Sequence, residues 1–413
     1  MPYQDNHSEI AIIGAGPAGI TAALVLGKKG ILCTLIDKDH FPREKICGDG
    51  LSGKVVSTLN KIDPEYARQL RQSGLATDSW SVRFFAPSSK MAEIDFRPAN
   101  QSLPPGFICK RADFDHFLLE KATALPEISF HPGIQVNKVS RSHDNVLLED
   151  STGTWKMTTN LVLMACGTNR SLLTALDPAY PGIEKEGIGI RAYFKNVSGC
   201  SDRNAIEIHF LRELLPWYLW IFPFSDNTAN VGLALPLRLA KQQNISLKKL
   251  LFQLIEKYPF LKTRFTGAEM LGKPAANRLP FYTGTFPLSG DRYMLLGDAA
   301  LLIDPFTGEG IGNAMVSGMI AADMAVLCNQ NNDYSSNATR QYHKKIYQQL
   351  KHDLDIGLRL HQLAEKPRLL NLVIGRASKN LKIRNLITEM LYNSNAKGKL
   401  SNWLFHLRLF LRL

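Results

Sequence analysis

The alternation of apolar and polar positions predicts a β-α-β unit at the start of the chain. Residues 9–13 (EIAII) and 31–36 (ILCTLI) are short apolar runs of strand length. Residues 17–28 between them have apolar positions at helical spacing, with a proline in the first turn and Gly30 just after the end. A strand, a crossover helix and a second strand of these lengths indicate a parallel sheet.

Later segments extend this pattern and then change it. Residues 161–165 and 293–296 are typical of short buried strands, and residues 110–123 and about 310–327 have helical spacing. Residues 38–60 begin as a glycine-rich loop. Strand-length runs separated by polar turns between about 186 and 236 predict an antiparallel sheet.

These elements predict an α/β fold with a Rossmann-like domain, an inserted antiparallel β-sheet domain and a helical C-terminus. A chain of 413 residues is long enough for two or three such units. We place the discontinuous Rossmann-like domain at 1–80, 106–180 and 286–330. The inserted domain takes 81–105 and 181–285, and the helical region takes 331–413.

Charge and cysteine spacing narrow the function classes. The net charge is +12, but residues from 331 onward hold 15 Lys and Arg against 5 Asp and Glu. The basic character thus belongs to the C-terminal fifth, and no nucleic-acid recognition motif accompanies it. None of the six cysteines has CxxC spacing, so we expect no metal site. The N-terminus has no signal-peptide pattern, which favours a cytoplasmic location.

The glycine turn of residues 14–19 (GAGPAG) has the GxGxxG pattern between the first strand and its helix. Gly14 permits a tight turn, Gly16 lets a pyrophosphate approach the backbone, and Gly19 lets the helix pack closely on the strand. Asp37 ends the second strand, where an acid binds a ribose hydroxyl. This context predicts dinucleotide binding, although the motif does not distinguish FAD from NAD.

A second motif, Gly297-Asp298 followed by residues 304–314 (DPFTGEGIGNA), makes that distinction. It resembles FAD-dependent oxidoreductases of the p-hydroxybenzoate hydroxylase-like superfamily. The resemblance implies that Asp298 contacts the ribityl chain of FAD and that the Pro305–Gly312 loop lies beside the isoalloxazine. A helix N-terminus at that place would stabilise the anionic reduced flavin.

Within that superfamily, two segments are similar to the geranylgeranyl reductase family. Residues 43–51 (REKICGDGL) resemble a segment that passes near the flavin, and residues 218–223 (YLWIFP) resemble a motif that lines a lipid cavity. Arg111, in KRADFD, matches an arginine that contacts FAD in the family, although it also suits a surface helix start. The motifs and the resemblance together assign to FAD the residues Gly14, Gly16, Ala18, Gly19, Asp37, Lys38, Arg43, Cys47, Gly48, Arg111, Gly297, Asp298, Pro305, Gly308, Gly310, Ile311 and Gly312.

The resemblance implies an FAD-dependent reductase that transfers hydride to a C=C bond of a long apolar, isoprenoid substrate. It nominates Cys47, Tyr218 and Trp220 as catalytic candidates. The strand alternation places Tyr218, Trp220 and Phe222 on one face, as a substrate-binding wall or as ordinary sheet packing. Cys47 is either beside the flavin or a small buried residue.

Other functions remain open on the same fold. It also supports monooxygenases and halogenases, and the WxWxIP pattern of the halogenase relatives differs here at Tyr218 and Phe222. A non-catalytic flavin-binding or membrane-recruitment protein is a further alternative. Cys166-Gly167 stands where the superfamily often has Asp-Gly, and no second GxGxxG follows. The electron donor is therefore undecided between NAD(P)H and a ferredoxin-like or other reductase partner.

Residues 397–413 combine an apolar stripe at helical spacing with Lys397, Lys399, Arg408 and Arg412. This pattern is typical of an interfacial amphipathic helix, which would place the protein peripherally on the inner membrane face. The alternative is a helix that docks on the protein's own core.

Overall fold

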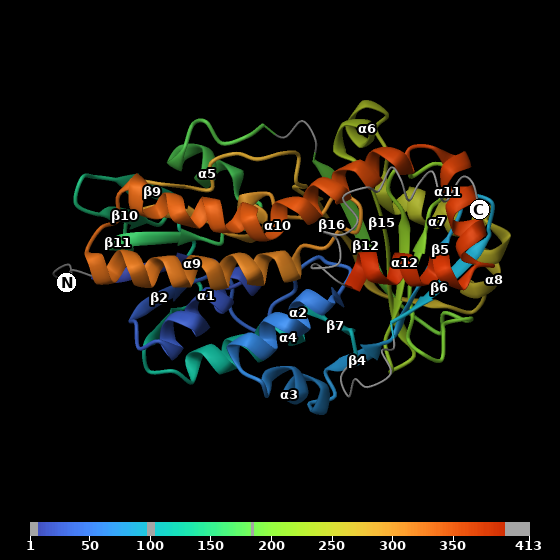
Figure 1. Cartoon of the computed structure of the whole chain (residues 1–413), viewed down its shortest axis with the longest axis horizontal. Coiled ribbons are helices and arrows are strands. Elements are labelled where there is room, and N and C mark those ends of the chain that lie inside the picture. Colours follow the sequence, from blue (N-terminus) through green and yellow to red (C-terminus); the bar gives the residue numbers. More distant parts are fainter. Residues whose placement is uncertain (1–6, 97–103, 183–185, 393–413) are drawn as a thin grey trace.

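The computed structural model describes residues 7–96, 104–182 and 186–392. Figure 1 shows two halves side by side, each built around one large sheet, with the long helices α9 (Ile311–Asn331) and α10 (Ser336–Ala364) running along the first half. The α/β fold predicted from the sequence is confirmed. The domain boundaries stay predictions.

The first half contains the predicted β-α-β unit at the predicted place. β1 (His7–Ile13) and β2 (Cys33–Ile36) pair in parallel, and α1 (Pro17–Lys28) connects them. The sheet order is β17-β18-β11-β1-β2-β8, with β9 and β10 added antiparallel beside β11. The remaining strands of this sheet are β8 (Ile128–His131), β9 (Lys138–Arg141), β10 (Val146–Glu149), β11 (Lys156–Met164), β17 (Ser289–Gly290) and β18 (Tyr293–Leu295).

The helices of the first half bury its sheet. α1 packs against α9 and α4 (Arg111–Thr123), and a short helix, α5 (Arg170–Leu176), contacts β9. The close approach of α1 to α9 depends on Gly318, because a Cβ there would overlap the Ala18 carbonyl oxygen. Small residues in both helices therefore bring the N-terminal and C-terminal parts of this half together.

The second half is built on a seven-stranded sheet with the order β16-β12-β15-β14-β13-β5-β6. It is antiparallel as predicted, except that β13 pairs in parallel with β5. Its strands are β5 (Ser81–Phe85), β6 (Met91–Asp95), β12 (Gly187–Lys195), β13 (Ile206–His209), β14 (Leu219–Pro223), β15 (Thr228–Pro236) and β16 (Glu269–Leu279). Three helices, α6 (Leu237–Gln242), α7 (Leu247–Lys257) and α8 (Pro259–Phe265), accompany this sheet.

Residues 38–60, which were expected to begin as a glycine-rich loop, contain a short strand and the start of a helix. α2 (Gly53–Ile62) starts at Ser52, whose side chain accepts a hydrogen bond from the Lys54 backbone N–H. α2 and α3 (Tyr66–Gln72) lie beside a three-stranded sheet of β3 (Gly50–Leu51), β7 (Gly106–Cys109) and β4 (Ala76–Ser79). The N-cap and the buried stripe after it, rather than the glycines, decide the conformation.

The C-terminal helices connect the two halves. α10 packs along α9 and β17, whereas α11 (Pro367–Ala377) and α12 (Leu381–Tyr392) pack on β6 of the second sheet. Ile374, Ala377 and Ile383 join the buried apolar cluster that contains Val82 and Trp220. Residues 397–413, for which an amphipathic helix is predicted, lie outside the described residues.

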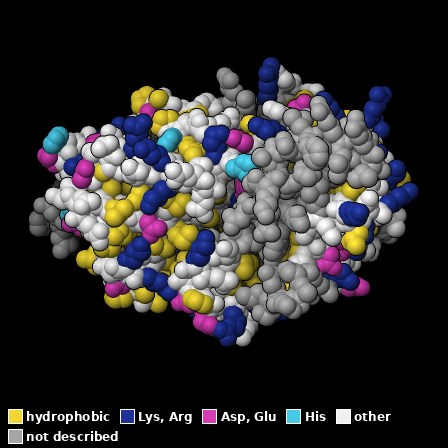
Figure 2. Space-filling view, in the orientation of Figure 1, with side chains coloured by type: hydrophobic (Ala, Val, Ile, Leu, Met, Phe, Trp, Pro, Cys, Tyr) yellow, Lys and Arg dark blue, Asp and Glu magenta, His cyan; other side chains and the backbone are white. Residues whose placement is uncertain are grey.

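One described helix has the length and composition of a membrane span, but it is buried in the protein. Among the described residues, α9 is long and apolar enough to cross a bilayer, but 78% of its most apolar stretch is buried inside the protein. It is therefore positioned as a core helix. Figure 2 shows Lys and Arg side chains spread over the visible described face rather than gathered in one patch.

Candidate functional site

A cavity of about 850 Å³ extends from the glycine turn after β1 to the aromatic face of the second sheet. Its lining includes the segment around Cys47, the loop before α9 and the start of α9 itself. The predicted site residues that line it are Gly14, Gly16, Ala18, Asp37, Lys38, Arg43, Cys47, Gly48, Arg111, Tyr218, Trp220, Phe222, Gly297, Asp298, Pro305, Gly308, Gly310, Ile311 and Gly312. Gly19 is the one predicted site residue absent from this lining.

The three motif glycines have different environments. Gly14 has φ +104°, and a Cβ there would overlap the Ala165 carbonyl oxygen. A Cβ on Gly19 would overlap the Gly14 carbonyl oxygen, so Gly19 serves the close packing of α1, as the motif predicts, and it does not line the cavity. A Cβ on Gly16 would meet only Arg43 Nη2, at 3.8 Å. Gly16 thus leaves open space at the N-terminus of α1, where backbone N–H groups attract phosphate.

Arg43 lies beside this opening and, within the described part of the chain, has an unused hydrogen-bond donor. It is 3.2 Å from the Asp115 carboxylate and 3.9 Å from Asp37. Its buried Nε has no hydrogen-bond acceptor among the described residues. Asp37 accepts hydrogen bonds from the backbone N–H of Ala15 at 2.6 Å and of Asp39 at 2.9 Å. A cationic donor beside an open helix N-terminus fits a pyrophosphate, and the carboxylate of Asp37 retains acceptor capacity for a ribose hydroxyl.

Arg111 begins α4 and makes a two-pronged ion pair with Asp115, at 2.8 and 2.6 Å. Burial alone would lower the pKa of Arg111, but the adjacent Asp115 carboxylate raises it, so the guanidinium is permanently charged. It lies beside the Cys47 thiol. Burial raises the pKa of Cys47, and the positive charge of Arg111 opposes that rise. Cys47 is therefore a protonated thiol that lines the cavity.

The loop of residues 304–310, which we call the flavin loop, is held in a fixed conformation before α9. The Asp304 carboxylate accepts hydrogen bonds from the backbone N–H of Phe306 at 2.9 Å and of Thr307 at 2.8 Å. The Tyr218 hydroxyl donates to the Thr307 carbonyl at 2.6 Å. The loop thus presents the N-terminus of α9 to the cavity, as stabilisation of a reduced flavin requires.

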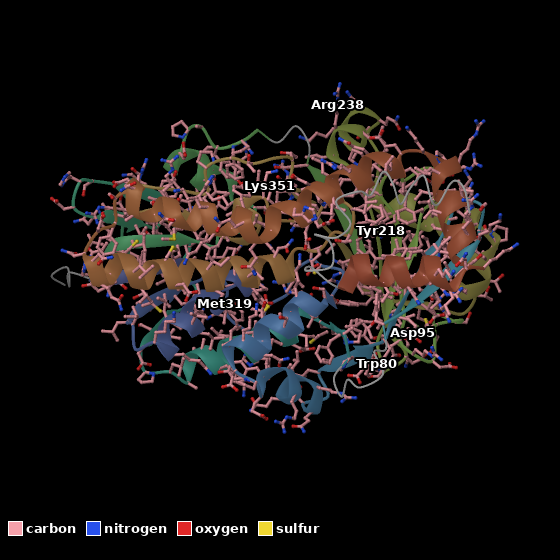
Figure 3. The ribbon with its side chains drawn as sticks, in the orientation of Figure 1. Trp80, Asp95, Tyr218, Arg238, Met319 and Lys351 are labelled. Atoms are coloured by element: carbon pink, nitrogen blue, oxygen red, sulfur yellow. The ribbon has the colours of Figure 1, made fainter. Side chains whose placement is uncertain are left out.

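Tyr218, Trp220 and Phe222 form what we call the aromatic wall. All three line the cavity, whereas Leu219 and Ile221 belong to a separate buried cluster behind the sheet, as the strand alternation predicts. Tyr218, labelled in Figure 3, lies in the half of the molecule that holds the second sheet. Further apolar side chains continue this surface, among them Val82, Phe84, Ile208, Phe210, Trp217 and Phe281.

The wall also packs against the cofactor side of the cavity. A Cβ on Gly48 would lie 3.1 Å from the Phe222 ring and 3.5 Å from Trp220 Nε1, and a Cβ on Gly50 would lie 3.2 Å from the Phe222 ring. The two interpretations of these aromatic side chains, ordinary sheet packing and a wall that faces a ligand, are therefore compatible with each other. They are packed side chains of the sheet, and they are also the surface that a ligand in the cavity would meet.

Sequence reasoning missed several lining or supporting residues. Lys45 lines the cavity with its Nζ near Gly167, and burial lowers its pKa. Trp217 precedes the aromatic wall by one residue and contacts Phe281. Asn230 is a fully buried amide in the apolar strand β15. A polar residue inside the apolar run TANVGLAL was the available signal for Asn230.

Comparisons with known proteins identify the class. The FAD binding domain family matches residues 7–157. With the glycine turn, the open α1 N-terminus and the flavin loop, this makes the chain an FAD-dependent oxidoreductase, and FAD is its cofactor. The prediction of FAD rather than NAD, made from the sequence motifs, is therefore confirmed.

The resemblance to geranylgeranyl reductases is also confirmed. The digeranylgeranylglycerophospholipid reductase of Thermoplasma volcanium is 26% identical over 351 residues, covering 82% of this chain and 83% of that protein. The crystal structure of a geranylgeranyl bacteriochlorophyll reductase-like protein from Thermoplasma acidophilum has the same fold, with a TM-score of 0.80, 21% identity and coverage of 97% of this chain and 100% of that chain.

A halogenating enzyme matches to a similar extent. The 1H-pyrrole-2-carbonyl-(peptidyl-carrier protein) chlorinase of Pseudomonas fluorescens is 26% identical over 374 residues, covering 83% of this chain and 81% of that protein. The chain is therefore similar both to a reductase and to a chlorinase, and the lining of the cavity bears on which chemistry it supports.

Proposed function

We propose that the protein reduces C=C bonds of a long apolar, isoprenoid substrate by hydride transfer from reduced FAD. The observation that carries this proposal is the continuity of the cavity, which joins the FAD-side residues directly to the aromatic wall. A mainly apolar surface with few polar groups suits a hydrocarbon chain. The reductase named for the Thermoplasma volcanium relative is consistent with such a substrate.

FAD, when bound and reduced by an external donor, supplies the hydride. The chain's own residues have the other tasks. The motif residues that line the cavity would hold the cofactor, with Gly16 and Arg43 toward its pyrophosphate and Asp298 toward its ribityl chain. The aromatic wall orients the alkene and excludes water, which matters because an isolated alkene is weakly polarised.

Hydride addition to one alkene carbon requires a proton at the other carbon. Cys47 is our candidate for holding that proton, because its thiol lines the cavity and burial keeps it protonated. Tyr218 is positioned differently, since its hydroxyl donates to the flavin loop. We therefore assign Tyr218 to holding that loop and Trp220 to orienting the substrate.

The test is anaerobic reoxidation of the dithionite-reduced holoprotein by a polyprenyl lipid. We expect the flavin to reoxidise and the lipid to gain two hydrogens, as seen by mass spectrometry. Cys47→Ser should slow this step while FAD content is retained. Trp220→Ala should weaken lipid use more than FAD content. Trp155→Ala, which removes a half-buried tryptophan outside the cavity lining, is the matched control. Equal loss of FAD and lipid use in Trp220→Ala would contradict the orienting role.

Oxygen-dependent chemistry is the second candidate, favoured by the similarity to the chlorinase. It predicts that reduced flavin is not reoxidised by lipid alone and that product forms only with oxygen, gaining an oxygen or halogen atom. The same anaerobic and aerobic reactions separate the two functions, because hydrogenation needs no oxygen.

The substrate class also supports a peripheral location on the inner membrane face. Long isoprenoid chains have negligible aqueous concentration, and the basic amphipathic pattern of residues 397–413 would attract anionic lipid, with each nearby Lys or Arg contributing about 1 kcal/mol. Co-sedimentation with anionic vesicles should fall with added salt and on deletion of residues 397–413, while FAD content stays unchanged. Loss of FAD or of folding in the truncated protein would favour core docking instead.

The electron donor is a separate question. NAD(P)H and a ferredoxin-like reductase partner are the two candidates, and reduction of the bound flavin in the absence of lipid distinguishes them. Rapid bleaching at 450 nm by NADH or NADPH alone would support a nicotinamide donor, while reduction only with a reduced ferredoxin would support a partner protein.

A further inference from the structure

Asn230 occupies a position that neither the motifs nor the proposed function explains. It lies on β15, is fully buried, and does not line the cavity. Its side-chain amide nevertheless contacts both sides of the site. The oxygen accepts a hydrogen bond from Trp220 Nε1 at 2.9 Å. The nitrogen donates to the Cys47 carbonyl at 2.8 Å and to the Asp49 carboxylate at 2.7 Å.

Asp49 extends this contact toward the start of α4. Its carboxylate accepts hydrogen bonds from the Tyr193 hydroxyl at 2.7 Å and from the Arg111 backbone N–H at 3.3 Å. Its backbone oxygen accepts from the Cys109 N–H at 2.9 Å. Asp49 has φ 66°, so these bonds hold a backbone conformation that a non-glycine residue rarely adopts.

The sheet leaves room for this arrangement at one glycine. Trp220 pairs with Gly232 across β14 and β15, and a Cβ on Gly232 would lie 2.6 Å from Trp220 Cε2. The indole therefore lies over Gly232, and its N–H reaches Asn230 two residues away on the same strand. The missing side chain at Gly232 leaves room for the indole ring, and the hydrogen bond to Asn230 fixes the orientation of the ring.

We propose that Asn230 is a positioning residue, because its single amide ties the Trp220 side of the cavity to the segment of Cys47, Gly48 and Asp49. Two segments about 180 residues apart are thereby held at a fixed spacing on either side of the cavity. Loss of the amide frees the Cys47 segment and the indole at the same time. The inference concerns the geometry of the site and does not depend on which substrate occupies it.

The test measures the alkylation of Cys47 by iodoacetamide in the FAD-loaded protein, by peptide mass spectrometry. Cys166 lines the same cavity and makes no hydrogen bond to this network among the described residues, so it serves as an internal reference. Asn230→Leu removes all three bonds and should raise the Cys47-to-Cys166 labelling ratio several-fold. Tyr193→Phe removes one donor to Asp49 and should raise the ratio less. Thr339→Val, which removes buried hydrogen bonds far from the cavity, should leave the ratio unchanged.

Asn230→Asp gives a signature that a merely structural residue would not give. The new carboxylate keeps the acceptor for Trp220 but faces the Asp49 carboxylate, so the pair is compatible with the network only while it shares one proton. Burial already raises the pKa of Asp49 to about 6. The one shared proton cannot also bond the Cys47 carbonyl. The labelling ratio should therefore lie between those of the unaltered protein and Asn230→Leu on the acid side, and rise further through a transition above pH about 6.

The labelling results distinguish a positioning role of Asn230 from a general loosening of the fold. A raised ratio in Asn230→Leu together with the pH transition in Asn230→Asp supports the proposal. An unchanged ratio in Asn230→Leu overturns it. A rise of Cys47 and Cys166 labelling together in every variant, including Thr339→Val, also overturns it, because that result reports general loosening. If Asn230→Leu does not fold, Tyr193→Phe and the pH series of Asn230→Asp carry the test.

Discussion

Replacement of Gly16 by alanine should separate cofactor binding from folding. Gly16 has φ −84° and ψ −177°, an extended conformation that alanine adopts without strain. The added methyl would meet only Arg43 Nη2, at 3.8 Å, which is ordinary contact. A compatible Gly→Ala change stabilises by about 0.4–1 kcal/mol through the unfolded chain. The apoprotein should therefore melt at the same temperature or slightly higher.

FAD binding should respond in the opposite direction. The methyl occupies the space through which a phosphate approaches the N-terminus of α1. Loss of one charge-assisted hydrogen bond costs about 1.5–3 kcal/mol. Since each ~1.4 kcal/mol is tenfold in affinity, FAD should bind about tenfold to a hundredfold more weakly. Flavin fluorescence titration of the apoprotein measures this change, and circular dichroism measures the melting temperature.

Gly14→Ala is the matched control, with the reverse expectation. Its φ of +104° and the overlap with the Ala165 carbonyl oxygen strain the folded state, at about 1–3 kcal/mol for the backbone conformation alone. Gly14→Ala should thus lose stability even without FAD. Unaltered FAD affinity in Gly16→Ala, measured on a well-folded protein, would show that the pyrophosphate does not lie at Gly16.

The remaining predictions concern the flavin loop and acid stability. Tyr218→Phe removes the hydroxyl bond to Thr307, so the free energy of unfolding should fall by about 1 kcal/mol and FAD should bind more weakly, as urea unfolding and flavin titration would show; an unchanged FAD affinity would mean that the bond does not hold the loop. Burial lowers the pKa of His209. Burial acts to raise the pKa of Glu207, but the hydrogen bond from His209 and the charge of Arg264 outweigh it, so the pKa of Glu207 is lowered. Both groups bind fewer protons folded than unfolded, so stability should fall as pH drops below about 6.5 and again below about 4.3. His209→Gln should flatten the first decline in a pH series of urea unfolding; a curve that keeps its slope there would assign the decline to other groups.

Local sequence patterns were sufficient to predict the helix and strands that border the glycine turn at one end of the cavity. The helix predicted at residues 17–28 has those bounds in the structure, and β1 and β2 flank it as expected. The alternation at residues 218–222 placed three aromatics on the cavity face. These results follow because helical and strand periodicity report directly which side of an element is buried.

Glycine-rich sequence was less informative on its own. The GxGxxG pattern predicted close helix packing at Gly19 and also placed Gly19 among the cofactor residues; the structure shows the packing, against the Gly14 carbonyl. The glycines after residue 47 suggested a loop, yet α2 begins at Gly53. A glycine in such a motif indicates that a Cβ would not fit at that position. Whether a ligand or the chain itself fills the space depends on the neighbouring atoms.

Local sequence patterns identified the β-α-β unit and the aromatic face, and the two glycine motifs with their family resemblance identified the cofactor, because each pattern lies within about twenty residues. Long-range packing, in contrast, brings Asn230 to Cys47 and Asp49, pairs Asp115 with both Arg43 and Arg111, and sets Tyr218 against the flavin loop. The first and last of these contacts join strands of the second sheet to segments of the first half. Their partners are set by how two independently patterned sheets pack against each other, and no local period in the chain encodes that packing.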